Sequence, residues 1–312
     1  MPMLVLCASG PAAADQQRRI ALTFDDAPRG AGPLFSGVVR TQRIVDHLDA
    51  GAVEGALFFV TTANLEREAD GRARLVSYVE AGHRLANHSH SHPWLWKTGV
   101  DDYLADVDRA SEVLATFDGV APYFRYPYLD EGRTVARRDA VRAGLAERGL
   151  RNGHVTVDNY DWFMNALLAE AVRSGRAIDE AAWCSAYTSI LIDGIEFYDR
   201  IARETLGRSP QHVLLLHEND LAALCLDDLI AALKDGGWAF VPAETAFGDP
   251  IAAWIPDTLF NGQGRVAALA AAAGQPLRTL VHESEDEAWL RRRFQSLGLL
   301  SEPTRSDAAG KP

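Results

Sequence analysis

Short apolar segments that each end in polar side chains constrain the fold of this chain more than any other feature. Residues 20–24 run directly into two aspartates, and residues 213–216 run into a histidine and a glutamate. Strands that alternate with helices predict a parallel sheet, either doubly wound or closed into a barrel. Because polar groups recur at the ends of the strands, we favour an α/β barrel whose chemistry lies on one face. Further strands are expected at residues 55–61, 84–87, 123–125 and 154–157, and helices at residues 41–50, 73–81, 101–117 and 179–206.

Length and charge narrow the class of protein. A chain of 312 residues is long enough for one large α/β domain with additions, or for two small domains. It carries 31 basic and 43 acidic side chains, which gives a formal net charge of -12. This balance argues against a nucleic acid or an anionic membrane as partner, and a neutral or cationic substrate is easier to accommodate. No apolar run approaches the roughly 20 residues that cross a bilayer, so we expect no membrane span.

The N-terminal residues resemble an export signal, and cysteine is scarce. A short apolar stretch at residues 3–7 precedes small residues at 12–14, although the usual basic segment is missing. If residues 1–18 are a signal, the protein is periplasmic or extracellular; otherwise it is cytoplasmic. The three cysteines, Cys7, Cys184 and Cys225, are widely spaced, which indicates neither a disulfide framework nor a zinc ribbon. Cys184 and Cys225 are able to pair, but we expect buried free thiols.

Candidate metal ligands lie in two of the strand-end segments. His88 and His92 stand four residues apart, a spacing that puts both imidazoles on one side of a single helical turn. The pair alone is weak evidence, because histidines at this spacing also cover surfaces or satisfy core hydrogen bonds. A hydrolytic metal site usually has a third protein ligand and leaves one position for water. Asp25 and Asp26 follow a buried strand and supply that carboxylate, unless they form an ordinary exposed acidic turn.

Five strand-end motifs, taken in order, resemble those of the polysaccharide deacetylases of carbohydrate esterase family 4, the NodB-type deacetylase domain. The motifs are Thr23-Phe24-Asp25-Asp26, His88-Ser89-x-x-His92, Arg125-x-Pro127-Tyr128, Asp158-x-x-Asp161-Trp162 and Val213-x-Leu215-x-His217. The resemblance implies a distorted (β/α)7-type barrel. The chain departs from the family pattern at Ala27, where a glycine usually precedes Pro28, and at Asn159, which replaces a small residue.

The resemblance also implies a role for each matched residue. Asp26, His88 and His92 would bind a divalent metal, most simply Zn²⁺, with Co²⁺ or Ni²⁺ as alternatives. A separate base is needed, because one carboxylate cannot easily both bind a cation and take a proton. The other roles are Asp25 as general base held by Arg125, His217 as general acid oriented by Asp161, the backbone N–H of Tyr128 at the oxyanion, and Trp162, Leu215 and Pro127 as walls of an acetyl-sized pocket.

Three parts are expected along the chain after this assignment. Residues 1–18 are the signal-like segment, and residues 19–249 form the deacetylase barrel, interrupted by a helical insertion at about residues 163–210. Residues 250–312 form a helical C-terminal extension that ends in a disordered polar tail after Ser301. The insertion and the extension exceed the family minimum, and we expect them to reshape the groove or to mediate self-association.

The function implied by the resemblance is hydrolysis of N-acetyl groups on an amino-sugar glycan, such as chitin oligomers or peptidoglycan, by metal-bound water with release of acetate. Two alternatives share this mechanism: an esterase for O-acetyl groups of xylan-like glycans and a C–N hydrolase for a small non-sugar amide. A third is a silent glycan-binding module, whose usual mark is loss of Asp25 or of a metal ligand. Trp94 and Trp96 follow the histidine pair and either stack on sugar rings or anchor the loop.

Overall fold

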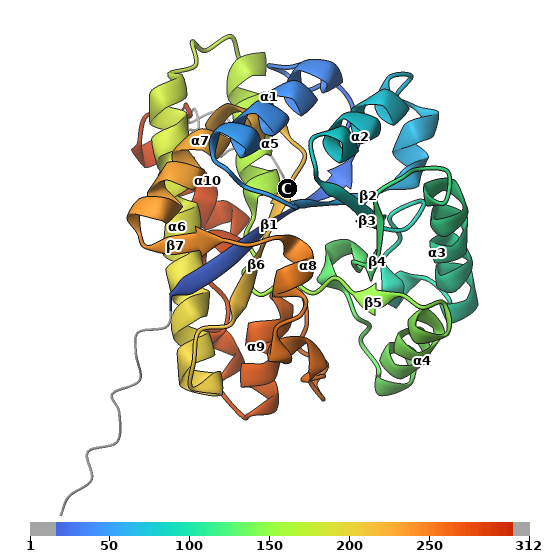
Figure 1. Cartoon of the computed structure of the whole chain (residues 1–312). Coiled ribbons are helices and arrows are strands. Elements are labelled where there is room, and N and C mark those ends of the chain that lie inside the picture. The colour runs from blue at the N-terminus through green and yellow to red at the C-terminus, as the bar shows by residue number, and fades with distance from the viewer. Residues whose placement is uncertain (1–16, 302–312) are drawn as a thin grey trace, which may run out of the picture.

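The computed structural model describes residues 17–301, in which a sheet of parallel strands is surrounded by helices (Figure 1). The strand order in the sheet is β5-β4-β3-β2-β1-β6, and β7 pairs with the first residues of β1. The strands are β1 (Arg18–Ala27), β2 (Leu57–Val60), β3 (Arg84–Asn87), β4 (Val120–Phe124), β5 (Arg151–Asn152), β6 (Gln211–His217) and β7 (Trp238–Phe240).

The two edges of the sheet approach each other after β5. An isolated parallel bridge joins Val157 to Leu214 of β6, and the backbone N–H of Thr156 donates to the carbonyl of Val213 at 3.0 Å. This closure confirms the predicted distorted (β/α) barrel. The strand expected at residues 154–157 is reduced to that single bridge, because the carbonyl of Val155 accepts instead from the backbone N–H of Arg265 in the C-terminal extension.

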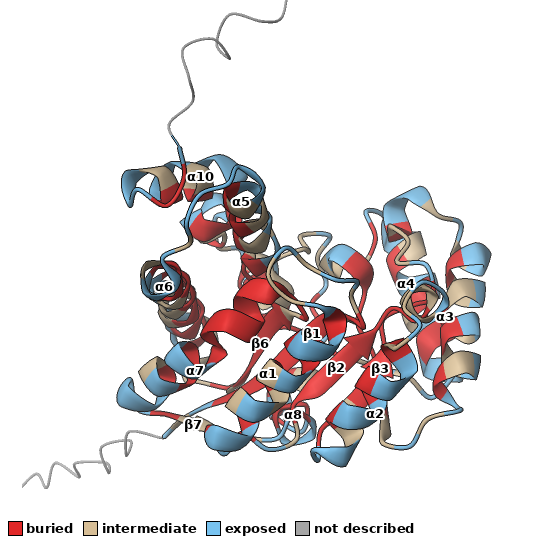
Figure 2. Ribbon diagram, turned by 90° about the horizontal axis from the view of Figure 1, so that it is seen from above, coloured by how far each residue is buried: buried red, intermediate tan, exposed pale blue. Residues whose placement is uncertain are grey.

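Amphipathic helices cover the outside of the sheet. Figure 2 shows their inner faces buried and their outer faces exposed, as expected for helices that pack one apolar face on a core. The α-helices are α1 (Gly37–Ala50), α2 (Gly71–Glu80), α3 (Val100–Leu114), α4 (Val135–Glu147), α5 (Asp161–Arg173), α6 (Glu180–Leu206), α7 (Asp220–Asp235), α8 (Ala243–Ala246), α9 (Gly264–Ala272) and α10 (Glu287–Ser296). The 3₁₀ helices are η1 (Thr62–Glu66), η2 (Leu95–Lys97), η3 (Pro127–Leu129), η4 (Pro250–Ala253), η5 (Leu277–Thr279) and η6 (Glu283–Glu285).

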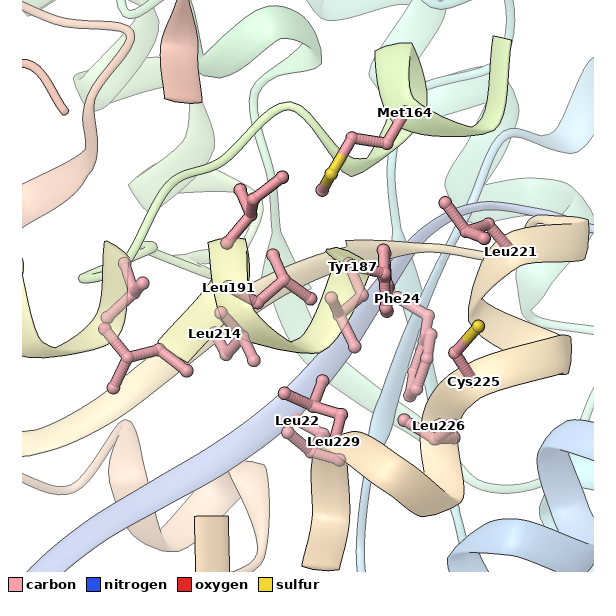
Figure 3. Close-up of a cluster of buried hydrophobic side chains, with 14 of the residues drawn as sticks. Leu22, Phe24, Met164, Tyr187, Leu191, Leu214, Leu221, Cys225, Leu226 and Leu229 are labelled. Atoms are coloured by element: carbon pink, nitrogen blue, oxygen red, sulfur yellow. The ribbon is translucent and has the colours of Figure 1, made fainter. Parts of the chain in front are cut away.

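The side chains of β1 point alternately toward two hydrophobic cores. This alternation sets the direction of the candidate base. Ile20, Leu22 and Phe24 pack against the helical layer, and Figure 3 shows Leu22 and Phe24 in this cluster. Ala21 faces a second cluster that includes Phe59 and Phe247 and fills the barrel. Because side chains two residues apart lie on the same face of a strand, the positions that follow Ala21 at intervals of two also face inward. Asp25, the first aspartate of the motif, therefore faces inward at the end of the strand.

The residues predicted as a helical insertion contain α6, a helix that belongs to the core. α6 buries Trp183, Tyr187, Leu191 and Tyr198, and Figure 3 shows side chains of α5, α6 and α7 together against β1 and β6. α6 thus occupies a place in the helical layer that covers the sheet. In the C-terminal extension, α9 packs on α6, and α10 lies beside α5. Residues 250–301 contain α9 and α10 together with the 3₁₀ helices η4, η5 and η6.

Cys184 and Cys225 form a disulfide, so the expectation of free thiols is wrong. Cys184 lies in the first turns of α6 and Cys225 in α7, and these two helices pack side by side. Their Cα atoms are 4.9 Å apart, within the range that a disulfide spans. The sequence separation of 41 residues hid this proximity, because it arises only when both helices dock on the sheet.

Two sequence predictions fall on residues outside the described range. The signal-like segment lies almost entirely in residues 1–16, and the polar tail expected to be disordered is residues 302–312. No helix within residues 17–301 is long and apolar enough to cross a membrane.

Candidate metal and catalytic site

Asp26, His88 and His92 converge at the carboxyl ends of β1 and β3. Asp26 Oδ1 lies 3.4 Å from His92 Nε2 and 3.8 Å from His88 Nε2, and the two imidazole Nε2 atoms are 3.2 Å apart. Each residue offers one ligand atom, and within the described chain they form a group able to hold a metal ion. The three residues that the sequence assigned as metal ligands are therefore brought together by the fold.

The histidine pair converges through a loop, so the predicted helical turn is wrong. The segment after β3 reverses with two residues at positive φ, Ser89 at 69° and His92 at 59°. Asn87 Oδ1 accepts from the backbone N–H of Ser89 at 2.7 Å, and Ser89 Oγ accepts from the backbone N–H of His92 at 3.0 Å. These side-chain bonds satisfy backbone groups that a helix would have paired internally, and they turn both imidazoles inward.

A positive φ at Asp26 lets two adjacent carboxylates reach the same site. In a regular strand Asp25 and Asp26 would point to opposite faces of the sheet. Asp26 instead has φ of 68°, a left-handed conformation that costs free energy for a residue with a Cβ atom. Asn64 holds this backbone by donating to the carbonyl of Asp26 at 3.0 Å. Strain of this kind at a candidate metal ligand is typical of a functional site.

Asp25, the candidate base, is buried and paired with Arg125. Arg125 Nη1 donates to Asp25 Oδ1 at 2.7 Å and to Thr23 Oγ1 at 2.8 Å. The guanidinium also stacks on the ring of Phe59, 3.9 Å from its centroid. The second oxygen of Asp25 remains directed to the metal residues, 3.6 Å from His88 Nε2. The pair keeps one carboxylate oxygen fixed and leaves the other available.

The candidate acid lies beside the candidate base because of strand register. Asp25 of β1 pairs directly with His217 of β6. His217 Nδ1 contacts Asp161 Oδ1 at 2.6 Å, and the other oxygen of Asp161 accepts from the backbone N–H of His217 at 2.9 Å. This carboxylate therefore fixes both the position and the orientation of the imidazole, with Nε2 on the side away from Asp161.

Two neighbouring asparagines hold Asp161, and sequence reasoning missed both. Asn159 Oδ1 accepts from the backbone N–H of Asp161 at 2.9 Å, and its Nδ2 donates to the carbonyl of Leu215 at 2.6 Å. Asn219 Nδ2 donates to Asp161 Oδ2 at 2.9 Å. In the sequence, Asn159 differs from the family pattern but shows no sign of this role. Its amide ties the loop of the fourth motif to the strand of the fifth.

The pKa values in the site follow from burial and from neighbouring charges. Burial alone would raise the pKa of Asp26, but His92, Arg29 and His217 lower it well below its usual range. Burial lowers the pKa of His92 to about 4, which keeps the imidazole neutral, as metal ligation requires. Burial also opposes the charged form of His217, but the carboxylate of Asp161 outweighs it and raises the pKa of His217. The imidazole of His92 thus favours the neutral form, whereas that of His217 favours the protonated form.

The remaining predicted pocket residues have different surroundings. Tyr128 lies in a left-handed turn with φ of 58°, and its ring is 4.5 Å from that of His92. Pro127 and Leu215 are buried, and Leu215 pairs with Thr23 across the β1–β6 ladder. Trp162 is 37% exposed and packs on Tyr160 and Phe163. That an acetyl-sized pocket forms between these residues remains a prediction.

Four buried charges behind the site were not anticipated from the sequence. Arg74 pairs with Glu218 at 2.7 Å, and Arg40 pairs with Asp220 at 2.7 Å. The backbone N–H of Arg29 donates to Glu218 Oε2 at 2.5 Å, and its carbonyl accepts from Arg74 Nη2 at 2.8 Å. This network clamps the loop after the first metal ligand onto the segment after the candidate acid. Arginines on the inner faces of two amphipathic helices were the available signal in the sequence.

A buried carboxyl pair links the C-terminal extension to the loop of the fourth motif. Glu285 of η6 and Asp158 are both buried, and Tyr198 donates to Glu285 Oε1. Burial raises the pKa of Glu285 to about 7 and raises that of Asp158 well above its usual range, the latter with a further contribution from the charge of Glu285. Burial therefore favours the protonated form of both carboxyls.

This pair predicts a pH-dependent stability. Above its unfolded pKa of about 4.3, Glu285 keeps a proton in the folded state that the unfolded chain has released, up to a pH of about 7. The free energy of unfolding should therefore fall as pH rises across this window, and Glu285→Gln should remove roughly 2 to 3 kcal/mol of that fall. Urea unfolding at pH 5 to 8 measures it. Glu283→Gln, an exposed neighbour on η6, is the control, and equal slopes in the wild type and Glu285→Gln would contradict the raised pKa of Glu285.

Comparison with known proteins finds several similar sequences. Residues 12–147, which contain the first three motifs, match the family model described as polysaccharide deacetylase. The chain is therefore similar, over these residues, to the polysaccharide deacetylases. Peptidoglycan-N-acetylglucosamine deacetylase of Bacillus cereus is 34% identical over 110 residues, which is 35% of this chain and 36% of the relative. The chain therefore spans well under half the length of that relative.

Two further similarities reach beyond the region of the family match. Peptidoglycan-N-acetylglucosamine deacetylase PgdA of Listeria monocytogenes is 24% identical over 241 residues, covering 76% of this chain and 41% of the relative. The solved structure of a mutant of peptidoglycan deacetylase PdaC from Bacillus subtilis is 20% identical with a TM-score of 0.49, covering 76% of this chain and 94% of that chain.

Proposed function

We propose that this chain is a metal-dependent deacetylase that hydrolyses N-acetyl groups of an amino-sugar glycan and releases acetate. The observation that carries the proposal is the convergence of Asp26, His88 and His92 on one point, with Asp25 and His217 beside it. A lone cluster of ligands could be structural, but a metal cluster flanked by an oriented base and an oriented acid is suited to hydrolysis.

The residues present fit a divalent metal such as Zn²⁺. Four ligand atoms at about 2.0–2.1 Å from a tetrahedral zinc lie about 3.3 Å from one another. The three candidate ligand atoms are separated by 3.2, 3.4 and 3.8 Å. His88 Nδ1 contacts the carbonyl of Arg125 at 2.9 Å, which favours a proton on Nδ1 and a free Nε2 for the metal. Three protein ligands leave one position for water or substrate.

We assign the proton transfers to the two oriented side chains. When bound, a divalent metal would lower the pKa of water and polarise the acyl oxygen. Asp25 takes the proton from the attacking water, and Arg125 fixes this carboxylate by donating to its Oδ1. His217 holds a proton next to the site because Asp161 raises its pKa, and it delivers that proton to the departing amine. The acid and base functions are thus divided between adjacent strands.

The substrate contacts complete the proposal. The backbone N–H of Tyr128 stabilises the oxyanion, and Trp162, Leu215 and Pro127 wall the acetyl group. Relatives whose names specify deacetylation of N-acetylglucosamine in peptidoglycan support an amino-sugar glycan as substrate. We assign residues 19–249 as the catalytic barrel and residues 250–301 as a supporting extension. The disulfide between Cys184 and Cys225 supports export to an oxidising compartment.

Acetate release from a substrate panel tests the proposal. Chelated enzyme with and without added Zn²⁺ is assayed on N-acetylglucosamine oligomers, peptidoglycan fragments, acetylxylan and small cyclic amides. Metal-restored release from the amino-sugar substrates is the expected result. Release from acetylxylan or cyclic amides alone would keep the site and overturn the substrate. No acetate release from any substrate of the panel would favour a glycan-binding module.

A further inference from the structure

Three aromatic rings lead away from the candidate metal site and have no role in the mechanism above. The ring of Tyr128, next to His92, lies 4.1 Å from that of Trp94, with an interplanar angle of 31°. Trp96 continues the series at 6.0 Å from Trp94. We call Tyr128, Trp94 and Trp96 the aromatic strip. It begins beside the candidate ligand His92 and is formed by η3, by η2 and by the residue that precedes η2.

The strip is accessible to a ligand. Tyr128 is 47% exposed and Trp96 is 37% exposed, while Trp94 is half-buried between them. The backbone of Trp96 is fixed by two hydrogen bonds. Its N–H donates to the buried Asp130 at 2.9 Å, and its carbonyl accepts from Arg137. A fixed backbone with exposed rings indicates a preformed contact surface more than a simple loop anchor.

Cations border the outer end of the strip. Lys97 Nζ lies 5.1 Å from the ring centroid of Trp94 and 4.8 Å from that of Trp96. The Arg133 guanidinium lies 4.5 Å from the ring centroid of Trp96. Both side chains belong to exposed residues, and neither forms an ion pair with an acidic side chain of residues 17–301. The nearby Asp130 is turned inward and bonded to two backbone N–H groups.

We propose that the aromatic strip binds the glycan strand next to the reaction centre, and that Lys97 and Arg133 select a strand that carries carboxylates over a neutral one. This inference rests on the proposed deacetylase function and names its substrate class: an acidic amino-sugar strand, such as one with lactyl carboxylates on its sugars. The net charge of -12 disfavours an acidic ligand at long range. Salt screens the field of the net charge beyond about 8–10 Å. The cations that contact the strand therefore determine whether an acidic or a neutral strand binds more tightly.

Calorimetric titration tests the selection without relying on turnover. The probes are peptide-free peptidoglycan strands and the same strands after amidation of their carboxylates. The wild type should bind the acidic strands about 10-fold more tightly, and the double variant K97Q/R133Q should lose that preference, since two exposed charge contacts contribute a few-fold each. K97R/R133K keeps both charges and should keep the preference. Equal affinity of the wild type for both strands, or a preference that survives in K97Q/R133Q, would overturn the selection.

A further variant tests the strip itself. Trp96→Ala should weaken the binding of acidic and amidated strands to the same degree, because contact with a ring face does not depend on the carboxylates. Unchanged affinity in this variant would exclude the strip as the glycan surface. Failure of the proposed function is seen separately, as absence of acetate release by zinc-loaded wild type from the same strands.

Discussion

Asp25→Asn is expected to lower the kcat of acetate release by about 10²–10⁴-fold, the usual contribution of a positioned general base. The asparagine Oδ1 can still accept the hydrogen bond that Arg125 Nη1 donates to Asp25 at 2.7 Å, so the side chain keeps its place. An amide cannot take a proton from water at neutral pH. The variant therefore loses the general base but keeps the size and position of the side chain. Steady-state kinetics on the amino-sugar substrate identified by the panel measure the effect.

Two controls separate lost chemistry from lost structure in this variant. Arg125 is fully buried, and removal of its anionic partner leaves a charge that costs about 3–5 kcal/mol when uncompensated. Thermal unfolding therefore has to accompany the kinetics, together with zinc content. Asp139→Asn makes the same chemical change at an exposed position of α4. It should change neither the kcat nor the thermal unfolding. Activity of Asp25→Asn within tenfold of the wild type, with zinc bound, would place the base elsewhere.

His88→Ala is expected to abolish metal binding and acetate release together. His88 contributes one of three ligand atoms, and its Nδ1 is fixed by the carbonyl of Arg125. Changes to the outer-shell partners of metal ligands alone typically reduce metal affinity 10–100-fold, so loss of a ligand should cost at least about 100-fold. Equilibrium dialysis followed by metal analysis gives the affinity independently of activity, for Zn²⁺, Co²⁺ and Ni²⁺ in turn.

His90 provides a matched control for the ligand variant. It lies in the same loop and is buried, but its Nδ1 contacts Thr62 Oγ1 at 2.9 Å, and it is not part of the metal group. His90→Asn should retain metal affinity and most of the activity. A metal affinity of His88→Ala equal to that of His90→Asn would show that the metal, if bound, uses other residues.

The sequence determined the barrel and the composition of the site. Strands that alternate with helices require a parallel sheet, and parallel strands bring their carboxyl ends to one edge. Asp26 and His217, almost two hundred positions apart in the chain, could therefore be expected near each other from their places after two strands. Apolar and turn patterns act over short distances, which is why helix α6 was expected from residue 179 and is found at Glu180–Leu206.

Features that depend on contacts between distant segments were decided by the tertiary structure. The histidine pair reaches the metal position through a left-handed loop, since side-chain bonds from Asn87 and Ser89 replace the helical ones. The cysteines pair because two helices pack on the same sheet. The carboxyl pair at Glu285 likewise forms only where the extension meets the motif loop. Local patterns contain no information about which distant groups share a buried environment, and burial is what sets the pairing, the strain and the pKa values found here.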